Sequence, residues 1–416
     1  MLNRVAITGM GVISSLGDSS RDLHAAFCNG QAAAYRLQKE NEEEDSFRGG
    51  RIASFLAGPY LKGRHLRPLD RTGQMAASAV KLALETSGWS SERLAAHEVG
   101  LVLGTMFGSI HTISQFDRQS LVQGPASVSP MDFANTVINA AAGQTAIWHN
   151  LRGINSTIAC GSTSGLMALG YAADLIRFGG QTAILAGGCE EFCFESYCGF
   201  DRAGMLCQNG AGYNTLPVPF AAARTGFAVA EAAGLLMLEE WEFAVARGAR
   251  ILGEIQGHGN AYAFDNAMPN PGPSAIARAM TAAITDAGLS PRDIDCISAS
   301  ANGSVEADQQ EAFAIHGLFN GRAAEVPVTA LKSVVGEALG ATGALQAIDV
   351  VETIRTQRLP GICGLKEIDP SLPALNFCRG SQNLRVRHGL ITSVGFDGSV
   401  CALVIGESPR AGATCC

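Results

Sequence analysis

Two potential nucleophiles, Cys160 and Ser162, lie in a turn of small residues, 159–165. The residues before this turn favour a buried strand, and the residues after it carry apolar side chains at helical spacing. In α/β enzymes such a strand presents a nucleophile at the N-terminus of a helix, where the helix dipole and free N–H groups stabilise negative charge. The same pattern is typical of an ordinary strand–turn–helix crossover, so the turn by itself does not establish an activity.

A second apolar, β-rich run follows the predicted helix and ends Ala186-Gly-Gly-Cys-Glu190. The turn, the helix and this strand, with nearly the whole chain around them, resemble the elongating β-ketoacyl-ACP synthases, condensing enzymes with the thiolase fold. In that family the nucleophilic Cys opens the helix, a fixed distance before a strand ending Ala-Gly-Gly-x-Glu. Counting back from Glu190 places the nucleophile position at Ser162, and Cys160 lies two residues too early. The resemblance therefore implies that a serine stands where the family has its catalytic thiol.

The first histidine motif of the family has a counterpart here without histidine. The resemblance places this His in an A-H-G-T-x-T segment ahead of a D-x-x-E helix start. An ungapped alignment on Asp308 and Glu311 puts Ser300 at the position. A two-residue deletion puts Asn302 there instead. Neither side chain is an imidazole, so the resemblance implies that the first catalytic His is missing.

The second catalytic His belongs in a K-x-x-x-G-H-x-x-G-A-x-G segment. The chain keeps the Lys, Lys332, and every Gly of this motif, but Glu337 replaces the His. A carboxylate at this place would repel the malonyl carboxylate and the developing enolate. Because Glu337 lies five residues after Lys332, we expect an internal ion pair if both side chains are buried.

Further segments resemble the family outside the reactive centre. Residues 395–398, Gly-Phe-Asp-Gly, stand where the family has a Gly-Phe-Gly. The resemblance implies an acyl-pocket gate at Phe396, with Gly395 and Gly398 in the oxyanion region. Residues 219–234 resemble the family signature P-F-D-x-x-R-x-G-F-x-x-x-E-G-x-G, and the matching positions are Arg224, Gly226, Phe227, Glu231 and Gly234.

The segment after Ser129 resembles the dimer-face helix of the family, which also helps to wall the partner's acyl tunnel. The resemblance assigns this role to Phe133, Thr136, Val137 and Asn139. The alternative for any one of these residues is packing in the chain's own core.

The chain thus resembles a condensing enzyme that has lost its thiolate and both imidazoles. A thiol suits acyl transfer because its pKa is about 8.5 and a helix N-terminus lowers it, whereas a Ser hydroxyl needs an adjacent base. We therefore assign no catalytic residue. The resemblance implies a non-condensing, chain-length-factor-like subunit that pairs with an active ketosynthase and shapes the acyl tunnel of a type II polyketide or fatty-acid-like synthase. Acyl carrier protein is the second expected partner, and Ser162, in place of the Gln usual in aromatic-polyketide chain length factors, suggests a lineage such as the aryl polyenes.

An enzyme of altered chemistry is the alternative. Ser162 would accept an acyl group and Glu337 would act as its base, in an acyltransferase, hydrolase or decarboxylase. A carboxylate without an intervening His is a poor base for Ser. Cys160 as a displaced nucleophile is a third hypothesis, and the competing interpretation is a small buried apolar residue.

The resemblance implies an α/β, thiolase-like fold with two similar βαβ-rich halves in a five-layered α-β-α-β-α arrangement. We expect the halves at 1–250 and 251–410, followed by a tail at 411–416. The sequence patterns predict strands, helices and loops by composition and periodicity. Predicted are strands at 5–13, 99–105, 251–255, 294–298 and 391–394, helices at 70–87 and 274–287, an acidic loop at 39–50 and a polar loop at 256–273.

Composition excludes several other classes of protein. The 416 residues are 47% hydrophobic and 16% charged, which favours large cores over disorder. A net charge of −8 gives no support to nucleic-acid binding. The twelve Cys show no metal-ligand spacing, so we expect no metal and no cofactor. Without a signal peptide or an apolar run of membrane-spanning length, the pattern favours a cytoplasmic protein with reduced thiols.

Overall fold

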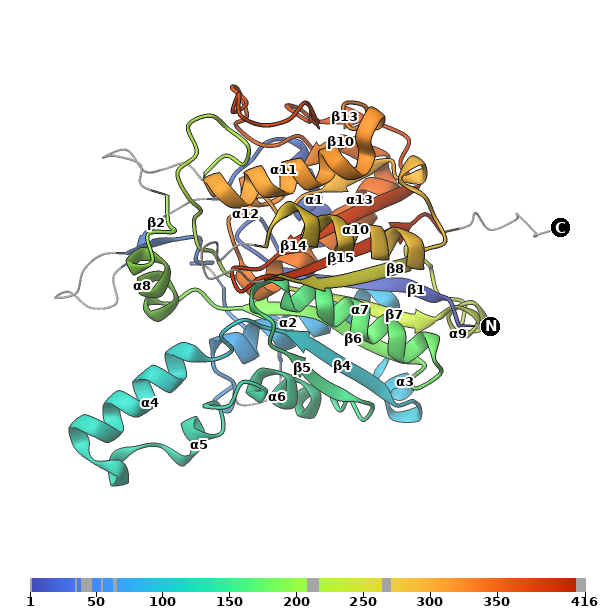
Figure 1. Cartoon of the computed structure of the whole chain (residues 1–416). Helices are drawn as coiled ribbons and strands as arrows, with labels where there is room; N and C mark the ends of the chain where they lie inside the picture. The colour runs from blue at the N-terminus through green and yellow to red at the C-terminus, as the bar shows by residue number, and fades with distance from the viewer. Residues whose placement is uncertain are drawn as a thin grey trace.

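The computed structural model describes residues 2–33, 36–38, 47–53, 55–62, 66–207, 217–263 and 271–408. Eleven strands of this part of the chain form one mixed sheet (Figure 1). In sheet order they are β12 (Asn376–Phe377), β10 (Pro327–Thr329), β9 (Cys296–Ser298), β14 (His388–Val394), β15 (Ser399–Gly406), β8 (Gly253–Tyr262), β1 (Val5–Ile13), β7 (Ala232–Glu240), β6 (Ala183–Glu190), β4 (Val99–Gly104) and β5 (Asn155–Ile158).

The sheet has two halves with the same sequence of strand directions. In the first half, β7 is antiparallel to β1 and β6 is antiparallel to β7. Further out, β4 is parallel to β6 and β5 is parallel to β4. In the second half, β15 is antiparallel to β8 and β14 is antiparallel to β15. Further out, β9 is parallel to β14 and β10 is parallel to β9. The two halves meet where Val5–Ile7 pairs antiparallel with Gly253–Ile255. The expected pair of similar halves is confirmed.

Helices cover both outer faces of the sheet and fill the space between its halves. The outer helices are α2 (Arg71–Ser87) and α6 (Ala140–His149) on the first half, and α10 (Pro273–Asp286) and α11 (Val305–Phe319) on the second. The inner helices, α7 (Ser164–Arg177) and α13 (Thr342–Thr356), contact each other and strands of both halves. Every residue from Thr342 to Ile354 is buried, as the middle of five layers requires. The expected thiolase-like fold is confirmed.

The remaining elements connect these layers or extend from them. They are α1 (Ser20–Cys28), β2 (Arg36–Gln38), β3 (Phe47–Gly49), α3 (Ser91–Ala96), α4 (Ile110–Gln123), α5 (Pro130–Phe133), α8 (Phe194–Arg202), α9 (Trp241–Ala246), α12 (Lys332–Val335), β11 (Arg358–Leu359) and β13 (Gln382–Asn383). Within the described ranges, no helix has the length and apolarity to cross a membrane. The same ranges contain no group of three or more His, Cys, Asp or Glu side chains that could hold a metal ion.

Glycines in the first strand of each half let an outer helix approach the backbone. A Cβ on Gly9 or Gly11 of β1 would lie 2.5 Å or 1.9 Å from a backbone carbonyl oxygen of α2. A Cβ on Gly257 or Gly259 of β8 would lie 2.3 Å or 2.4 Å from a backbone carbonyl oxygen of α10. The two halves therefore use the same Gly-x-Gly contact to seat α2 and α10.

Two loop predictions are wrong in part, and the glycine contact explains the first of them. The polar loop expected at 256–273 is β8 as far as Tyr262, because its glycines serve helix packing and not a turn. Residues 264–270 of that loop lie outside the described residues. Of the acidic loop expected at 39–50, residues 39–46 lie outside the described residues, and Phe47–Gly49 forms β3, which pairs with β2. The tail expected at 411–416 also lies outside them, and the boundary at residue 250 stays a prediction.

The variant Gly259→Val tests the helix contact. Its side chain would overlap the α10 backbone, so we expect the free energy of unfolding to fall by about 1–3 kcal/mol or more, measured by chemical denaturation. The control is Gly317→Ala, where an added Cβ meets nothing within 4 Å and a small gain is expected from helix propensity. Equal stability of the Gly259→Val variant and the wild type would contradict the proposed contact.

Candidate functional site

A buried ion pair occupies the segment that follows β10. Lys332 begins α12, Glu337 follows it, and Lys332 Nζ lies 2.7 Å from Glu337 Oε2. The side chains are 3% and 0% exposed. The other carboxylate oxygen of Glu337 accepts hydrogen bonds from the Leu339 N–H (3.1 Å) and the Thr342 hydroxyl (3.1 Å). The expected ion pair is confirmed, and both oxygens of Glu337 are occupied.

Both candidates for the first histidine position contact this ion pair. Asn302 Nδ2 donates a hydrogen bond to Glu337 Oε2 (3.0 Å). Lys332 Nζ donates to Ser300 Oγ (3.2 Å). We call Lys332, Glu337, Asn302 and Ser300 the polar cluster. Because each candidate touches one member of the pair, the geometry leaves both alignments open.

Two buried carboxylates hold the backbone of the 300–303 segment. Asp308 Oδ1 accepts from the Asn302 N–H (3.0 Å), and Glu311 Oε1 accepts from the Ser300 N–H (2.8 Å). Burial raises the pKa of Asp308 to about 6 and that of Glu311 to about 7. In the sequence, Asp308 and Glu311 served only to align a motif. Their spacing at the start of a helix was the one sign that they could also bind the backbone of the preceding segment.

Ser162 lies apart from the carboxylate that could have served as its base. It is buried in the turn that precedes α7, and its hydroxyl donates to the Val394 carbonyl oxygen (3.3 Å). The Val394 N–H donates to Ser300 Oγ (3.0 Å), so Val394 links Ser162 to the polar cluster. Among the described residues no hydrogen bond joins Ser162 to Glu337. The Ser–Glu pair that the alternative hypothesis requires is not assembled.

The turn after β14 is tied to the turn that carries Cys160. Asp397 Oδ1 accepts from the Ser399 hydroxyl (2.6 Å), which also lies 3.0 Å from the hydroxyl of Thr163. Cys160 is half-buried, and burial followed by the nearby Asp397 charge raises the pKa of its thiol. A thiol with a raised pKa is a poor nucleophile. Cys160 is therefore neither activated nor the fully buried residue that the sequence suggested.

Gly395 and Gly398 shape the same turn. The Gly395 N–H donates to the Ser399 carbonyl oxygen (2.8 Å), so this N–H is not free to hold an oxyanion. Gly398 has φ +89°, which favours glycine because a Cβ is strained there. These glycines are structural in this conformation, and their place in an oxyanion region stays a prediction.

Phe396 belongs to an aromatic cluster that fills the space beside the reactive centre. Its ring centroid lies 5.1 Å from that of Phe227 and 5.4 Å from that of Phe200. Phe200 in turn lies 6.0 Å from Phe107. The cavity between Phe396 and the polar cluster measures about 10 Å³, about the space that one water needs. An acyl chain would require Phe396 or its neighbours to move, and sequence patterns gave no signal for Phe107 or Phe200.

The end of β6 places two further buried carboxylates near these aromatic residues. Glu190 accepts hydrogen bonds from the N–H groups of Met106 (2.6 Å) and Phe107 (2.8 Å), and burial raises its pKa to about 7. Glu191 is 4% exposed, and its Oε1 has no hydrogen-bond partner among the described residues. Burial, with a contribution from the Asp70 charge, raises the pKa of Glu191 to about 8. Both carboxyl groups carry a proton more readily in the folded chain than in the unfolded one.

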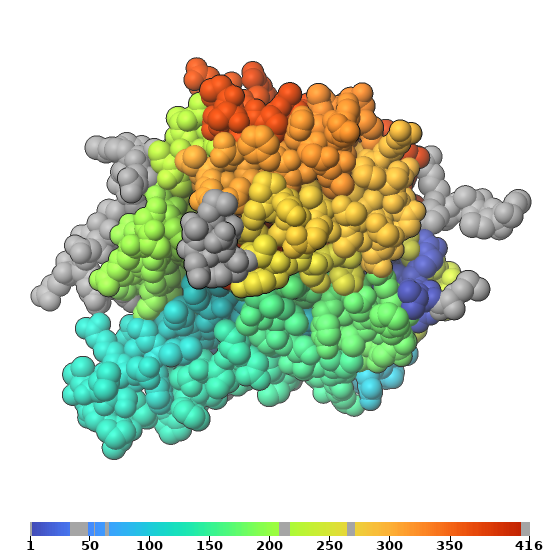
Figure 2. All heavy atoms as spheres, viewed as in Figure 1, coloured from blue at the N-terminus to red at the C-terminus, as the bar shows by residue number. Residues whose placement is uncertain are grey.

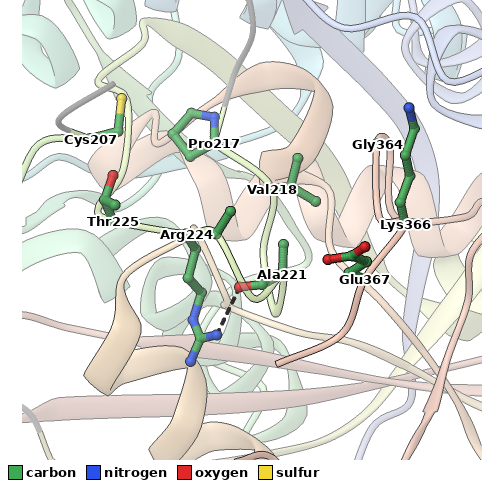
Figure 3. A pocket seen from close by; sticks show the side chains of 10 residues that line it. Cys207, Pro217, Val218, Ala221, Arg224, Thr225, Gly364, Lys366 and Glu367 are labelled. Carbon is green, nitrogen blue, oxygen red and sulfur yellow. Dashed lines mark hydrogen bonds between the residues drawn. The ribbon is translucent and has the colours of Figure 1, made fainter. Parts of the chain in front are cut away.

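A cavity of about 370 Å³ lies between the 217–225 segment and the 364–367 segment (Figure 3). Arg224 in its wall donates to the Ala221 carbonyl oxygen (2.9 Å) and to Asp369 (2.6 Å), so its guanidinium is held within the chain. No member of the polar cluster lines this cavity. The other residues that shape it include Cys207, Pro217, Val218, Thr225, Lys366 and Glu367.

The expected dimer segment begins at the end of an arm that projects from the body of the molecule (Figures 1 and 2). The arm consists of residues 110–133, from α4 to α5, and no residue of α4 is buried. Phe133 and Val137 are 63% and 51% exposed, so packing in the chain's own core is wrong for both. Thr136 is half-buried and Asn139 is exposed. Further exposed apolar side chains of this region are Leu121, Val122, Met131 and Ile138.

Comparisons with known proteins match almost the full chain to β-ketoacyl synthases. The model of the β-ketoacyl synthase N-terminal domain matches residues 2–244, and that of the C-terminal domain matches residues 252–366. The 3-oxoacyl-[acyl-carrier-protein] synthase 2 of Rhizobium meliloti is 31% identical over 97% of this chain and 99% of its own length. A structure described as the ishigamide ketosynthase/chain length factor is 29% identical, with a TM-score of 0.90, and the match covers 98% of this chain and 100% of the other. A β-ketoacyl synthase from Burkholderia phymatum is 29% identical, with a TM-score of 0.91 and the same coverage.

The variant Glu337→Gln tests the buried ion pair. Gln keeps the shape but leaves the Lys332 charge unpaired, so we expect the free energy of unfolding to fall by about 3–5 kcal/mol. The double variant Lys332→Met/Glu337→Gln should recover part of this loss, because no unpaired charge remains. Denaturant unfolding of both single variants and the double variant gives the coupling energy. Strictly additive losses would show that the two charges do not interact.

The variant Glu191→Gln tests the buried carboxyl group. The pKa of Glu191 is raised to about 8 from the ordinary 4.5, so the folded state binds the extra proton and wild-type stability falls as pH rises between these values. The variant lacks this penalty, and its stability relative to wild type should rise over that window by at most about 1.4 kcal/mol per pH unit. The exposed Glu242, changed to Gln, is the control. A stability difference that does not depend on pH would contradict the assignment.

Proposed function

The chain belongs to the β-ketoacyl synthase family, and we propose that it is a non-condensing subunit that pairs with an active ketosynthase. In this role it shapes the acyl tunnel of a type II polyketide synthase or a fatty-acid-like synthase, as a chain length factor does. Because Ser162 replaces the Gln usual in aromatic-polyketide chain length factors, the product class that we propose is a reduced polyene such as an aryl polyene.

The polar cluster is the observation that carries this proposal. Condensation needs a thiolate to hold the growing chain and imidazoles to stabilise the enolate. Here the hydroxyl of Ser162 donates to a carbonyl oxygen, and Glu337 is neutralised by Lys332. Neither group is free to accept an acyl chain or to act as a base in this arrangement. The chain therefore keeps the shape of a reactive centre without its chemistry.

Two surfaces of the chain support assembly with another subunit. The arm and the segment after it expose Phe133 and Val137, whose burial would each be worth about 1.5–3 kcal/mol if complete. Strand β5 is the last strand of its half of the sheet and pairs only with β4 among the described strands. Exposed sheet edges readily add a strand from another chain. A partner that covers both surfaces would bury the apolar arm and extend the sheet.

The relatives support the choice of partners. The ishigamide structure is described as a ketosynthase/chain length factor, and it covers nearly the whole of this chain. The name of the Rhizobium meliloti relative includes an acyl carrier protein. We propose the same two partners for this chain. They are an active ketosynthase with its Cys and His residues intact, and an acyl carrier protein that serves the pair.

Co-expression with an active ketosynthase of the same organism, with its Cys and His residues intact, tests the proposal. We expect the two chains to purify as a heterodimer, and we expect Phe133→Asp/Val137→Asp to abolish co-purification because buried carboxylates would lie unpaired in the interface. The matched control is Phe178→Asp, since Phe178 is also exposed (73%) but lies at the end of α7. A stable homodimer that ignores the ketosynthase would contradict the heterodimer.

The same preparation tests the loss of condensation. We expect no chain elongation by this protein alone with malonyl carrier protein, and full elongation by the heterodimer. Incubation with acyl carrier protein should leave the intact mass of this chain unchanged. A mass increase that disappears in Ser162→Ala would instead support the acyl-accepting enzyme.

A further inference from the structure

A second polar hollow lies at the far end of α13 from the polar cluster. Thr342, in the first turn of α13, contacts Glu337, whereas Arg355 in its last turn lines the hollow. At a rise of about 1.5 Å per residue, these two ends lie about 20 Å apart. The hollow measures about 480 Å³, within the range of small-molecule sites. It is a separate feature and takes no part in the proposed function.

Four arginines from separate parts of the chain line this hollow. Arg21 comes from α1, Arg250 from the turn before β8, Arg355 from α13 and Arg385 from the segment before β14. Two of them are paired: Arg355 Nη1 lies 2.8 Å from Glu352 Oε1, and Arg385 Nη2 lies 2.6 Å from an oxygen of Glu407.

Arg21 and Arg250 form no hydrogen bond or ion pair through their side chains with any other part of the described chain. Two guanidinium groups therefore stay uncompensated at one hollow, although the chain as a whole has a net charge of −8. A guanidinium offers a planar fork of N–H donors that matches two phosphate oxygens at once. Unpaired forks at one site favour a ligand with two neighbouring phosphate groups.

The wall of the hollow is fixed by contacts between α1 and α13. The Ser20 hydroxyl donates to the buried Glu352 carboxylate (2.6 Å). One turn further, His24 Nδ1 lies 2.7 Å from Asp349 Oδ1. Burial lowers the pKa of His24, but the hydrogen bonds with Asp349 and Cys28 outweigh it and raise the pKa to about 10. This buried ion pair holds α1, and with it Arg21, in place against α13.

Three of the residues that line the hollow are apolar, and we call them its floor. Ile251 and Leu252 are half-buried, and Ile354 is buried. An apolar floor beneath charged walls suits a ligand with a flat or aliphatic part next to its anionic group. Free nucleic acid is a poor match, because the charge is confined to one hollow and does not extend into a basic stripe.

We propose that this hollow binds a small molecule with a diphosphate group, held by Arg21 and Arg250. The diphosphate can be free or can belong to a nucleoside diphosphate, whose base would lie on the apolar floor. The site lies where the two halves of the fold meet near β1 and β8, so an occupied hollow also ties α1 to the segments before β8 and β14.

Isothermal titration calorimetry of the full chain at low salt tests the site, with inorganic pyrophosphate and ADP as separate probes. We expect both to bind, ADP more tightly if the floor contributes, and Arg21→Ala/Arg250→Ala to weaken binding by about tenfold or more. Arg292→Ala, an exposed arginine outside the hollow, should change nothing. Because Arg21 and Arg250 have no side-chain partner in the described fold, thermal unfolding of the double variant should match that of the wild type.

Two results would overturn the proposal. One is no heat of binding with either probe at millimolar concentration. The other is equal binding by the wild type and the Arg21→Ala/Arg250→Ala variant. Binding of pyrophosphate without ADP would support a free diphosphate, and tighter binding of ADP would support a nucleotide. None of these results depends on a ketosynthase partner, so the two proposals stand or fall separately.

Discussion

The buried ion pair between Lys332 and Glu337 is the constraint on which the reactive centre depends. In a low-dielectric interior each charge is tolerable only because the other is 2.7 Å away. The pair also binds both candidates for the first histidine position, Ser300 and Asn302. A carboxylate that is neutralised and fully hydrogen-bonded cannot serve as a base. The same network therefore stabilises this part of the fold and leaves Glu337 unable to act as a base.

The scaffold around this centre keeps the features that give it shape. Both halves seat an outer helix on a Gly-x-Gly strand, and α13 is buried between them. Aromatic packing of Phe396 on Phe200 and Phe227 leaves only a cavity of about 10 Å³ between Phe396 and the polar cluster. Packing of this kind requires volume and close contact but no reactive group. The fold of this chain therefore does not depend on a thiol at position 162 or on an imidazole at position 337.

Two features of the surface stand out: the exposed apolar side chains at and after the arm, and the hollow lined by four arginines. Phe133 at the end of the arm and Val137 in the segment after it are exposed, and contact with another subunit would remove this apolar area from water. The hollow gathers unpaired guanidinium groups from Arg21 and Arg250 at the end of α13 that lies away from the polar cluster. The exposed apolar side chains favour contact with a protein partner. The hollow favours a small anion because two of its arginines have no acidic partner in the described chain.

The sequence by itself determined the architecture and predicted the positions of the candidate site residues. Glycine motifs and apolar runs are local, so counting from Glu190 and aligning on Asp308 was enough to reach Ser162, Ser300 or Asn302, and Glu337. The same local logic failed at Gly257 and Gly259, where glycines in β8 resembled those of a loop because the helix that requires them is absent from the local pattern. Only the tertiary structure decided that Ser162 faces the Val394 carbonyl and that the arginines of the hollow meet. Such contacts join segments hundreds of residues apart, and no spacing rule encodes them.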